Sequence, residues 1–147
     1  MRIRQSDPGE LEALLDVWLR SVRATHAFLE ESDILNLVPA VRDYLANPDA
    51  ELWTLLSDES QPIAFMGLAD NTVESLFVAP EQLRRGAGRM LLAHARKLKG
   101  ALRVDVNEQN PEAVRFYEAN GFHVVGRSPV DDAGRPFPLL HMREGSS

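Results

Sequence analysis

The sequence predicts a mixed α/β fold of the α+β kind, with one largely antiparallel sheet of about seven strands flanked by about four helices. Two observations support this prediction. Apolar residues recur at helical spacing up to residue 45, whereas from residue 51 three short strand-like runs follow one another across turns. Further along, two helical segments each follow a strand-like run and lead into another. The expected element order is therefore β-α-α-β-β-β-α-β-α-β-β.

The first third of the chain is expected to hold an edge strand and two helices. Residues 1–5 alternate in polarity, which suits an edge strand. Asp7 then suits a helix N-cap, Pro8 the first helical position, and Glu10 the end of a capping box. Apolar residues at helical spacing continue this helix, and a second helix is marked by those from Ile34 to Leu45. Pro39 either starts this second helix or kinks it.

The remaining elements follow from turns, caps and alternation. A helix after residue 88 is expected to end at Gly100, which suits a C-cap. A shorter helix has Asn110 as its N-cap, Pro111 at its first position and Gly121 as its terminator. Short turns between the central strands make them antiparallel neighbours. Strands are predicted over residues 51–57, 62–69, 72–79, 102–106, 122–128 and 138–144.

The composition indicates one globular domain over residues 1–147. The chain is 44% apolar and 26% charged, and no apolar run approaches the roughly 20 residues that a membrane span needs. The N-terminal residues lack the apolar region of a signal peptide, and there is no cysteine, so we expect a cytoplasmic protein without disulfides. The net charge of −6 argues against a duplex-binding protein, which carries a basic excess.

The positive charge is nevertheless concentrated. From Arg84 to Arg103 there are seven Lys or Arg residues and no acidic residue. This stretch is either the solvated face of a helix or a small anion site in an otherwise acidic protein. Binding of RNA through the same stretch is a further reading, which the acidic total disfavours.

A glycine loop, "LRRGAG" at residues 83–88, lies between a predicted strand and a predicted helix. It lacks the lysine and hydroxyl of a Walker loop. It also lacks the third glycine of a Rossmann fingerprint, because that position is Leu91. Two readings remain open on the loop alone. Its backbone amides from Leu83 to Gly88 cradle a phosphate at a helix N-terminus, or its glycines only allow close packing in a turn.

Two motifs together resemble the GNAT superfamily of acetyl-CoA-dependent N-acetyltransferases. The first is the strand, glycine loop and helix, with Arg85, Gly86, Ala87 and Gly88 at the end of the family signature and Leu83 where the family has Gln or Arg. The second is N-x-x-A-x-x-F-Y-x-x-x-G-F over residues 110–122, which matches at every fixed position. Further segments, among them "RSVRATHAFL" and "GRSPVDDAGRPFPLLHM", resemble the small bacterial YjaB-type members.

The resemblance implies the GNAT fold, acetyl-CoA as cofactor, and direct transfer of the acetyl group to a primary amine on a small molecule or a peptide. A non-catalytic acyl-CoA-binding module or sensor on the same fold is the alternative. The acceptor is not implied, no nucleic acid or membrane partner is expected, and a homodimer stays open. The residues expected to contact the cofactor are Phe77, Val78, Leu83, Arg84, Arg85, Gly86, Ala87, Gly88, Arg89, Asn107, Asn110, Ala113, Phe116 and Tyr117.

Three residues are candidates for the chemistry. Tyr117 occupies the family's tyrosine position, where a phenol protonates the leaving thiolate, and its other reading is a core aromatic beside Phe116. His26 and Glu74 are the candidate bases; His26 is otherwise a helix-end histidine. If strands alternate regularly, Glu74 and Leu76 share one face and Phe77 lies on the other. No metal site is expected, because cysteine and the H-E-x-x-H pattern are both absent.

Overall fold

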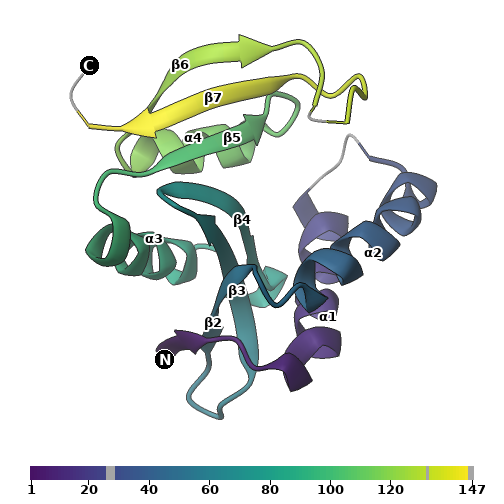
Figure 1. The fold of residues 1–147 in the computed structure, drawn as a ribbon, viewed down its shortest axis with the longest axis vertical. Coiled ribbons are helices and arrows are strands. Elements are labelled where there is room, and N and C mark those ends of the chain that lie inside the picture. Colours follow the sequence, from purple (N-terminus) through teal and green to yellow (C-terminus); the bar gives the residue numbers. More distant parts are fainter. Residues whose placement is uncertain (26–28, 132, 146–147) are drawn as a thin grey trace.

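The computed structural model describes residues 1–25, 29–131 and 133–145, and in these residues the strands form one sheet with the order β1-β2-β3-β4-β5-β7-β6 (Figure 1). Neighbouring strands are antiparallel except β4 and β5, which are parallel. The predicted fold class and element order are confirmed. The strands are β1 (Arg2–Gln5), β2 (Glu51–Leu56), β3 (Pro62–Ala69), β4 (Thr72–Val78), β5 (Arg103–Asn107), β6 (Phe122–Ser128) and β7 (Leu139–Glu144).

Helices cover both faces of the sheet (Figure 1). On one face, α1 and α2 enclose an apolar core with Leu52, Phe65 and Phe77. On the other face, α3 and α4 pack over a second core, which takes side chains from β3, β4, β5 and β7. The helical elements are η1 (Pro8–Glu10), α1 (Leu11–Thr25), α2 (Glu31–Ala46), η2 (Pro80–Gln82), α3 (Ala87–Lys99) and α4 (Pro111–Ala119).

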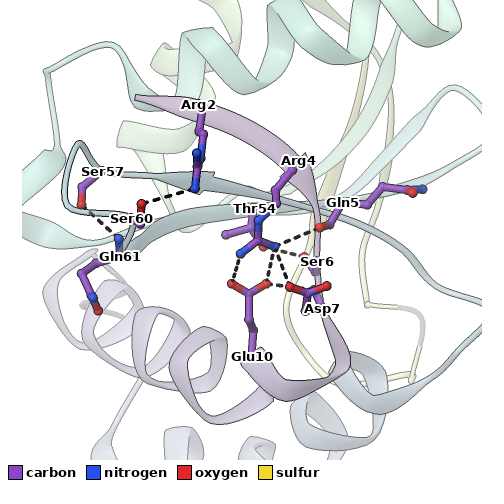
Figure 2. A network of polar contacts seen from close by, with 10 residues as sticks. All are labelled: Arg2, Arg4, Gln5, Ser6, Asp7, Glu10, Thr54, Ser57, Ser60 and Gln61. Carbon is purple, nitrogen blue, oxygen red and sulfur yellow. Dashed lines mark hydrogen bonds and ion pairs between the residues drawn. The ribbon is translucent and has the colours of Figure 1, made fainter.

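The start of α1 is tied to the edge strand by a polar network (Figure 2). The predicted capping box is present, and the Asp7 N–H donates to the Glu10 carboxylate at 2.9 Å. Its first turn is the 3₁₀ helix η1 rather than α-helix. Arg4 donates two hydrogen bonds to Glu10, at 2.9 and 2.8 Å, so the N-terminal strand and α1 are held together by a bidentate ion pair.

Pro39 lies inside α2, so it does not start this helix. The residue is exposed, so the Leu35 carbonyl that loses its backbone partner lies where water can reach it. The other predicted caps are confirmed. Gly100 follows α3 with φ 79°, and the Asn110 side chain accepts a hydrogen bond from Ala113 N–H at 3.2 Å.

The sheet divides at β4 and β5. These strands pair only at Thr72 with Arg103 and at Val73 with Val104, and beyond those residues they separate (Figure 1). We call this place the fork. A register shift in β4 opposite Gly67 and Leu68 makes Glu74 an additional residue between Val73 and Ser75. The fork opens the sheet between two strand ends, which is where the main cavity lies.

Candidate active site

A cleft of about 590 Å³ extends from the fork to the glycine loop. Its walls are the separating parts of β4 and β5, the start of α3, and one side of α4. Side chains of α1 close one end, where Ser21 and Thr25 line the cleft. The cleft therefore collects residues from five separate segments of the chain.

The glycine loop forms one end of this cleft. Gly86 is the N-cap of α3 and has φ 85°, and Arg84 has φ 65°, so the loop contains two left-handed residues. No heavy atom lies within 4 Å of the Cβ that a side chain at Gly86 would add. Gly86 is therefore required by its backbone angle, and the space beside it is open.

The amides of this loop are divided between two uses. Leu83 N–H donates to Pro80 O at 3.2 Å and Arg85 N–H to Gln82 O at 3.3 Å, so these two amides already serve the turn. The prediction that all the amides from Leu83 to Gly88 are available is wrong for these two. The first-turn amides of Ala87 and Gly88 have no carbonyl of their own helix to bond, as at any helix N-terminus. This arrangement presents donors and the positive end of the helix dipole to an anion.

Gly88 has a different reason to be glycine. An added Cβ there would lie 2.8 Å from the Cζ atom of Phe116 and 3.1 Å from its Cε1 atom. The ring of Phe116 thus packs directly on the first turn of α3. Gly88 thus permits close packing, which is the second sequence reading of the loop, whereas Gly86 leaves open space.

Arginines supply positive charge near the loop. Arg84, Arg89 and Arg115 line the cleft, and none of them has an ion pair or a side-chain hydrogen bond within the part of the chain that the structure describes. By contrast, Arg96 pairs with Glu144 and Lys99 with Glu51. The basic stretch is therefore split into residues that stabilise the fold and residues whose charge faces the cleft. Open amides and unpaired guanidinium groups fit a phosphate-bearing ligand.

Tyr117 lies in the cleft wall on α4, with only 7% of its surface exposed. Its ring contacts Phe116 and Phe122 edge-on, at centroid distances of 5.1 and 5.2 Å. Burial raises the pKa of the Tyr117 phenol well above its ordinary value. The hydroxyl makes no hydrogen bond to the described residues, yet it is not among the fully enclosed unpaired atoms. The phenol therefore carries its proton at neutral pH and is available to a ligand.

Glu74 lies at the fork and is exposed. It lines the cleft and also a second hollow of about 370 Å³, whose wall includes Asp105, Asp131 and Leu139. The expectation that Glu74 shares a face with Leu76 assumed regular alternation, which the register shift interrupts at Glu74. Leu76 packs against the α3 side. Burial raises the pKa of Tyr44 of α2, and the negative charge of Glu74 raises it further.

The sequence over residues 48–124 matches the acetyltransferase (GNAT) domain family. The chain is 44% identical to the peptidyl-lysine N-acetyltransferase YjaB of Salmonella typhimurium over 142 residues, which cover 97% of each protein. It is 32% identical to the peptidyl-lysine N-acetyltransferase YiaC of Escherichia coli over 136 residues, 91% of each. The chain belongs to the GNAT acetyltransferase family. The fold also matches the solution structure of apo-form YjaB from Escherichia coli, with a TM-score of 0.91, 42% identity and coverage of 99% of this chain and 98% of that one.

As a GNAT acetyltransferase, the chain is an N-acetyltransferase that uses acetyl-CoA, as the resemblance implied. The cleft fits this cofactor, because open amides and unpaired arginines face one end of a channel that reaches the fork. No helix of the described residues is long and apolar enough to cross a membrane. No cluster of three or more His, Cys, Asp or Glu side chains in those residues has an arrangement that would hold a metal ion.

The structure brings nearly all the GNAT candidates from the sequence to the cleft wall. Asn107 lines the cleft while its side chain accepts a hydrogen bond from Gln109 N–H at 2.9 Å. Arg85 is exposed on the loop but is not part of the cleft wall, and His26 lies outside the described residues. The cleft wall contains Glu74, Phe77, Val78, Leu83, Arg84, Gly86, Ala87, Gly88, Arg89, Asn107, Asn110, Ala113, Phe116 and Tyr117.

Sequence reasoning missed several residues of the site. Asp105 lines both the cleft and the second hollow, and it lies two residues before Asn107 on the same face of β5. Strand alternation from Asn107 was a signal that would have found it. Ser75 and Gln82 were also missed, and Ser75 accepts or donates a hydrogen bond with the Tyr44 hydroxyl at 2.9 Å.

Proposed function

We propose that this N-acetyltransferase moves the acetyl group of acetyl-CoA directly to the side-chain amine of lysine residues in peptides or proteins. The observation that carries the proposal is the fork, where the cleft meets a second hollow beside Glu74 and Asp105. Two carboxylates at this meeting point favour a cationic acceptor. Relatives with 44% and 32% identity over nearly the whole chain, named as peptidyl-lysine N-acetyltransferases, support the same acceptor.

We assign the phosphate-bearing end of the cofactor to the glycine loop. Acetyl-CoA supplies the activated acetyl group as a thioester. The amides of Gly86, Ala87 and Gly88 bind its pyrophosphate, and each hydrogen bond to a charged group contributes about 1.5–3 kcal/mol. Arg84 and Arg89 neutralise part of the phosphate charge. Leu83, in place of the family's Gln or Arg, contributes its backbone position and no charged contact.

The middle of the cleft is assigned to the pantetheine arm. Phe77 and Val78 line the cleft beyond the fork, where β4 has no parallel partner. Ala79 N–H donates to Ile63 O of β3, so by strand alternation the backbone N–H and C=O of Val78 point away from β3, toward a ligand that adds itself like a strand. Asn107 borders the opposite wall, and Asn110 caps α4 and lines the cleft. Ala113 and Phe116 supply the apolar side.

Tyr117 is assigned the role of donor to the leaving sulfur. The raised pKa widens the gap from a thiol, whose ordinary pKa is near 8.5. The hydroxyl therefore keeps its proton in the resting enzyme and donates a hydrogen bond as negative charge develops on sulfur. Glu74 is assigned as the base that takes the proton from the acceptor nitrogen, directly or through water. Both assignments are proposals about residues that line one cleft.

Tyr117→Phe tests the first assignment. We expect kcat to fall at least tenfold, about the loss of one general acid or oxyanion-type donor, with acetyl-CoA affinity within threefold of wild type. Tyr44→Phe is the matched control, because it removes the other tyrosine hydroxyl, which is bonded to Ser75 and does not line the cleft. Unchanged turnover of Tyr117→Phe would remove this residue from the mechanism.

The acceptor is tested with a peptide set in which the lysine side chain, the α-amine, or both are blocked, with free polyamines as further acceptors. Mass spectrometry locates the acetyl group, and thiol release gives the rate. We expect modification of the lysine side chain in the peptide whose α-amine is blocked. Acetylation confined to α-amines or to free polyamines would overturn the peptidyl-lysine acceptor and leave the N-acetyltransferase activity intact.

A further inference from the structure

A hydrogen-bonded chain of three side chains crosses β5, β7 and β6. The Nδ1 atom of His141 lies 2.6 Å from Oδ1 of Asp105, and its Nε2 atom lies 2.7 Å from the Oγ atom of Ser128. Asp105 and His141 are directly opposite each other in the β5–β7 register. The imidazole is thus held on both sides, although 36% of the His141 side chain and 45% of the Asp105 side chain are exposed.

The chemistry of the three groups fixes the direction of the bonds. A carboxylate only accepts hydrogen bonds, so Nδ1 of His141 carries the hydrogen and donates it to Asp105. In the neutral imidazole, Nε2 is then an acceptor, and the Ser128 hydroxyl donates to it. One carboxylate oxygen of Asp105 is therefore engaged and oriented. The other has no hydrogen-bond partner in the described part of the chain.

The chain ends at the fork. Val104 forms the last β5 pair with β4, so Asp105 is the first β5 residue after the strands part, and Glu74 follows the same last pair on β4. Asp105 lines both hollows, whereas Ser128 lines neither. In a hydrolytic Ser-His-Asp triad, the serine faces the substrate and the acid is buried behind the histidine. Here the order is reversed, because the carboxylate faces the cleft.

We propose that Asp105 accepts a hydrogen bond from the acceptor's ammonium group, and that His141, held by Ser128, is a positioning residue that orients this carboxylate. This inference rests on the proposed function, since it names how a lysine side chain is bound before transfer. It differs from the role assigned to Glu74, because Asp105 binds the acceptor and takes no proton from it.

The charge argument follows from the position of Asp105. Its carboxylate lies at the fork, where it lines both hollows together with Glu74, and two negative charges there attract an ammonium group. Arg135, the basic residue in the wall of the second hollow, is already paired with Asp131.

The test measures binding of a lysine peptide to the protein saturated with CoA, by calorimetry at pH 7.5. CoA carries no acetyl group, so binding is measured without reaction. A peptide with norleucine in place of lysine is the neutral control. For wild type, we expect the lysine peptide to bind at least tenfold more tightly than the norleucine peptide, because only the lysine peptide carries the ammonium group that Asp105 accepts from.

Variants at the two positions separate the roles. Asp105→Asn should weaken lysine-peptide binding about tenfold or more at pH 7.5 and leave norleucine-peptide binding unchanged. His141→Ala removes the donor that holds Asp105 and should weaken lysine-peptide binding about threefold to tenfold, whereas His141→Gln retains an N–H donor and should restore binding to within threefold of wild type. Thermal midpoint and acetyl-CoA affinity are measured for each variant to show that it is folded.

The outcomes distinguish this inference from the proposed function. If wild type acetylates the lysine peptide while Asp105→Asn binds it as tightly as wild type, the inference is wrong and the proposed function stands. If His141→Ala binds the lysine peptide as tightly as wild type, His141 does not orient this carboxylate. If wild type does not acetylate lysine in any peptide, the proposed acceptor fails first, and the inference fails with it.

Discussion

Gly86→Ala isolates what the left-handed loop residue does for acetyl-CoA. Alanine at φ 85° costs about 1–2 kcal/mol of backbone strain, although its methyl group meets no atom within 4 Å. If the loop relaxes to avoid this strain, the amides of the first turn lose their alignment. Loss of one to two hydrogen bonds to the phosphates, at about 1.5–3 kcal/mol each, weakens acetyl-CoA binding by about 10-fold to several hundred-fold or more.

Gly100→Ala is the matched control for this measurement. Gly100 has φ 79° and ψ −145° at the end of α3, a region that is even less suited to alanine, and an added Cβ there also meets nothing within 4 Å. It lies outside the cleft wall. Calorimetric titration with acetyl-CoA and a thermal melt are made on both variants, and only Gly86→Ala should lose affinity.

Two results would refute this reasoning. Wild-type affinity in a folded Gly86→Ala protein would mean that the loop conformation does not hold the cofactor. An equal loss of affinity in Gly100→Ala would mean that reduced stability alone weakens binding.

Three further predictions concern other parts of the molecule. Gly88→Ala brings a Cβ about 0.6 Å inside the ordinary contact limit with the Phe116 ring, which contacts Tyr117, so we expect turnover to fall. The thermal midpoint should move by less than about 4 °C, because alanine gains about 1 kcal/mol of helix propensity that offsets the clash. Unchanged turnover would contradict this. Burial, and secondly the charge of Lys97, lowers the pKa of His94 in the folded protein. The thermal midpoint should therefore fall as pH drops below about 6.5, the ordinary histidine value. His94→Phe should make this fall smaller in melts between pH 7.5 and 5. The Arg4 hydrogen bonds lower the pKa of Glu10, so Glu10→Gln should lower the thermal midpoint by about 3 °C at pH 7 and by progressively less as pH falls below 4.5, and a constant difference down to pH 3 would refute it.

Local patterns predicted most of the secondary structure because the signals are local. Asp7, Gly100 and Asn110 act within one helical turn of their own positions, and all three perform the expected capping roles. The alternation of the central strands likewise depends on neighbouring residues. The residues that determine these elements lie within the elements themselves, so a single sequence was enough to place them.

The fork and its side chains are not local, and the patterns did not reveal them. The separation of β4 from β5 begins at the register shift between β3 and β4, which also interrupts the expected alternation at Glu74. Asp105 and His141 are 36 residues apart in the chain, and Ser128 is 13 residues from His141. Only the sheet order, with β7 between β5 and β6, brings them together. The family resemblance gave the general position of the cleft but not this cluster.

The two residue pairs that join β4 to β5 have a consequence for the stability of the folded protein. They are the only backbone ladder between a four-stranded and a three-stranded part of the sheet, as far as the described residues extend. A ligand bound along the separated strands contacts both parts of the sheet. Because it binds the folded protein, it raises the free energy of unfolding by about 2.7 kcal/mol at a concentration of a hundred times its Kd. The stability of the folded enzyme therefore depends on the concentration of its own acetyl donor. When acetyl-CoA is scarce, we expect β4 and β5 to separate more readily at the fork.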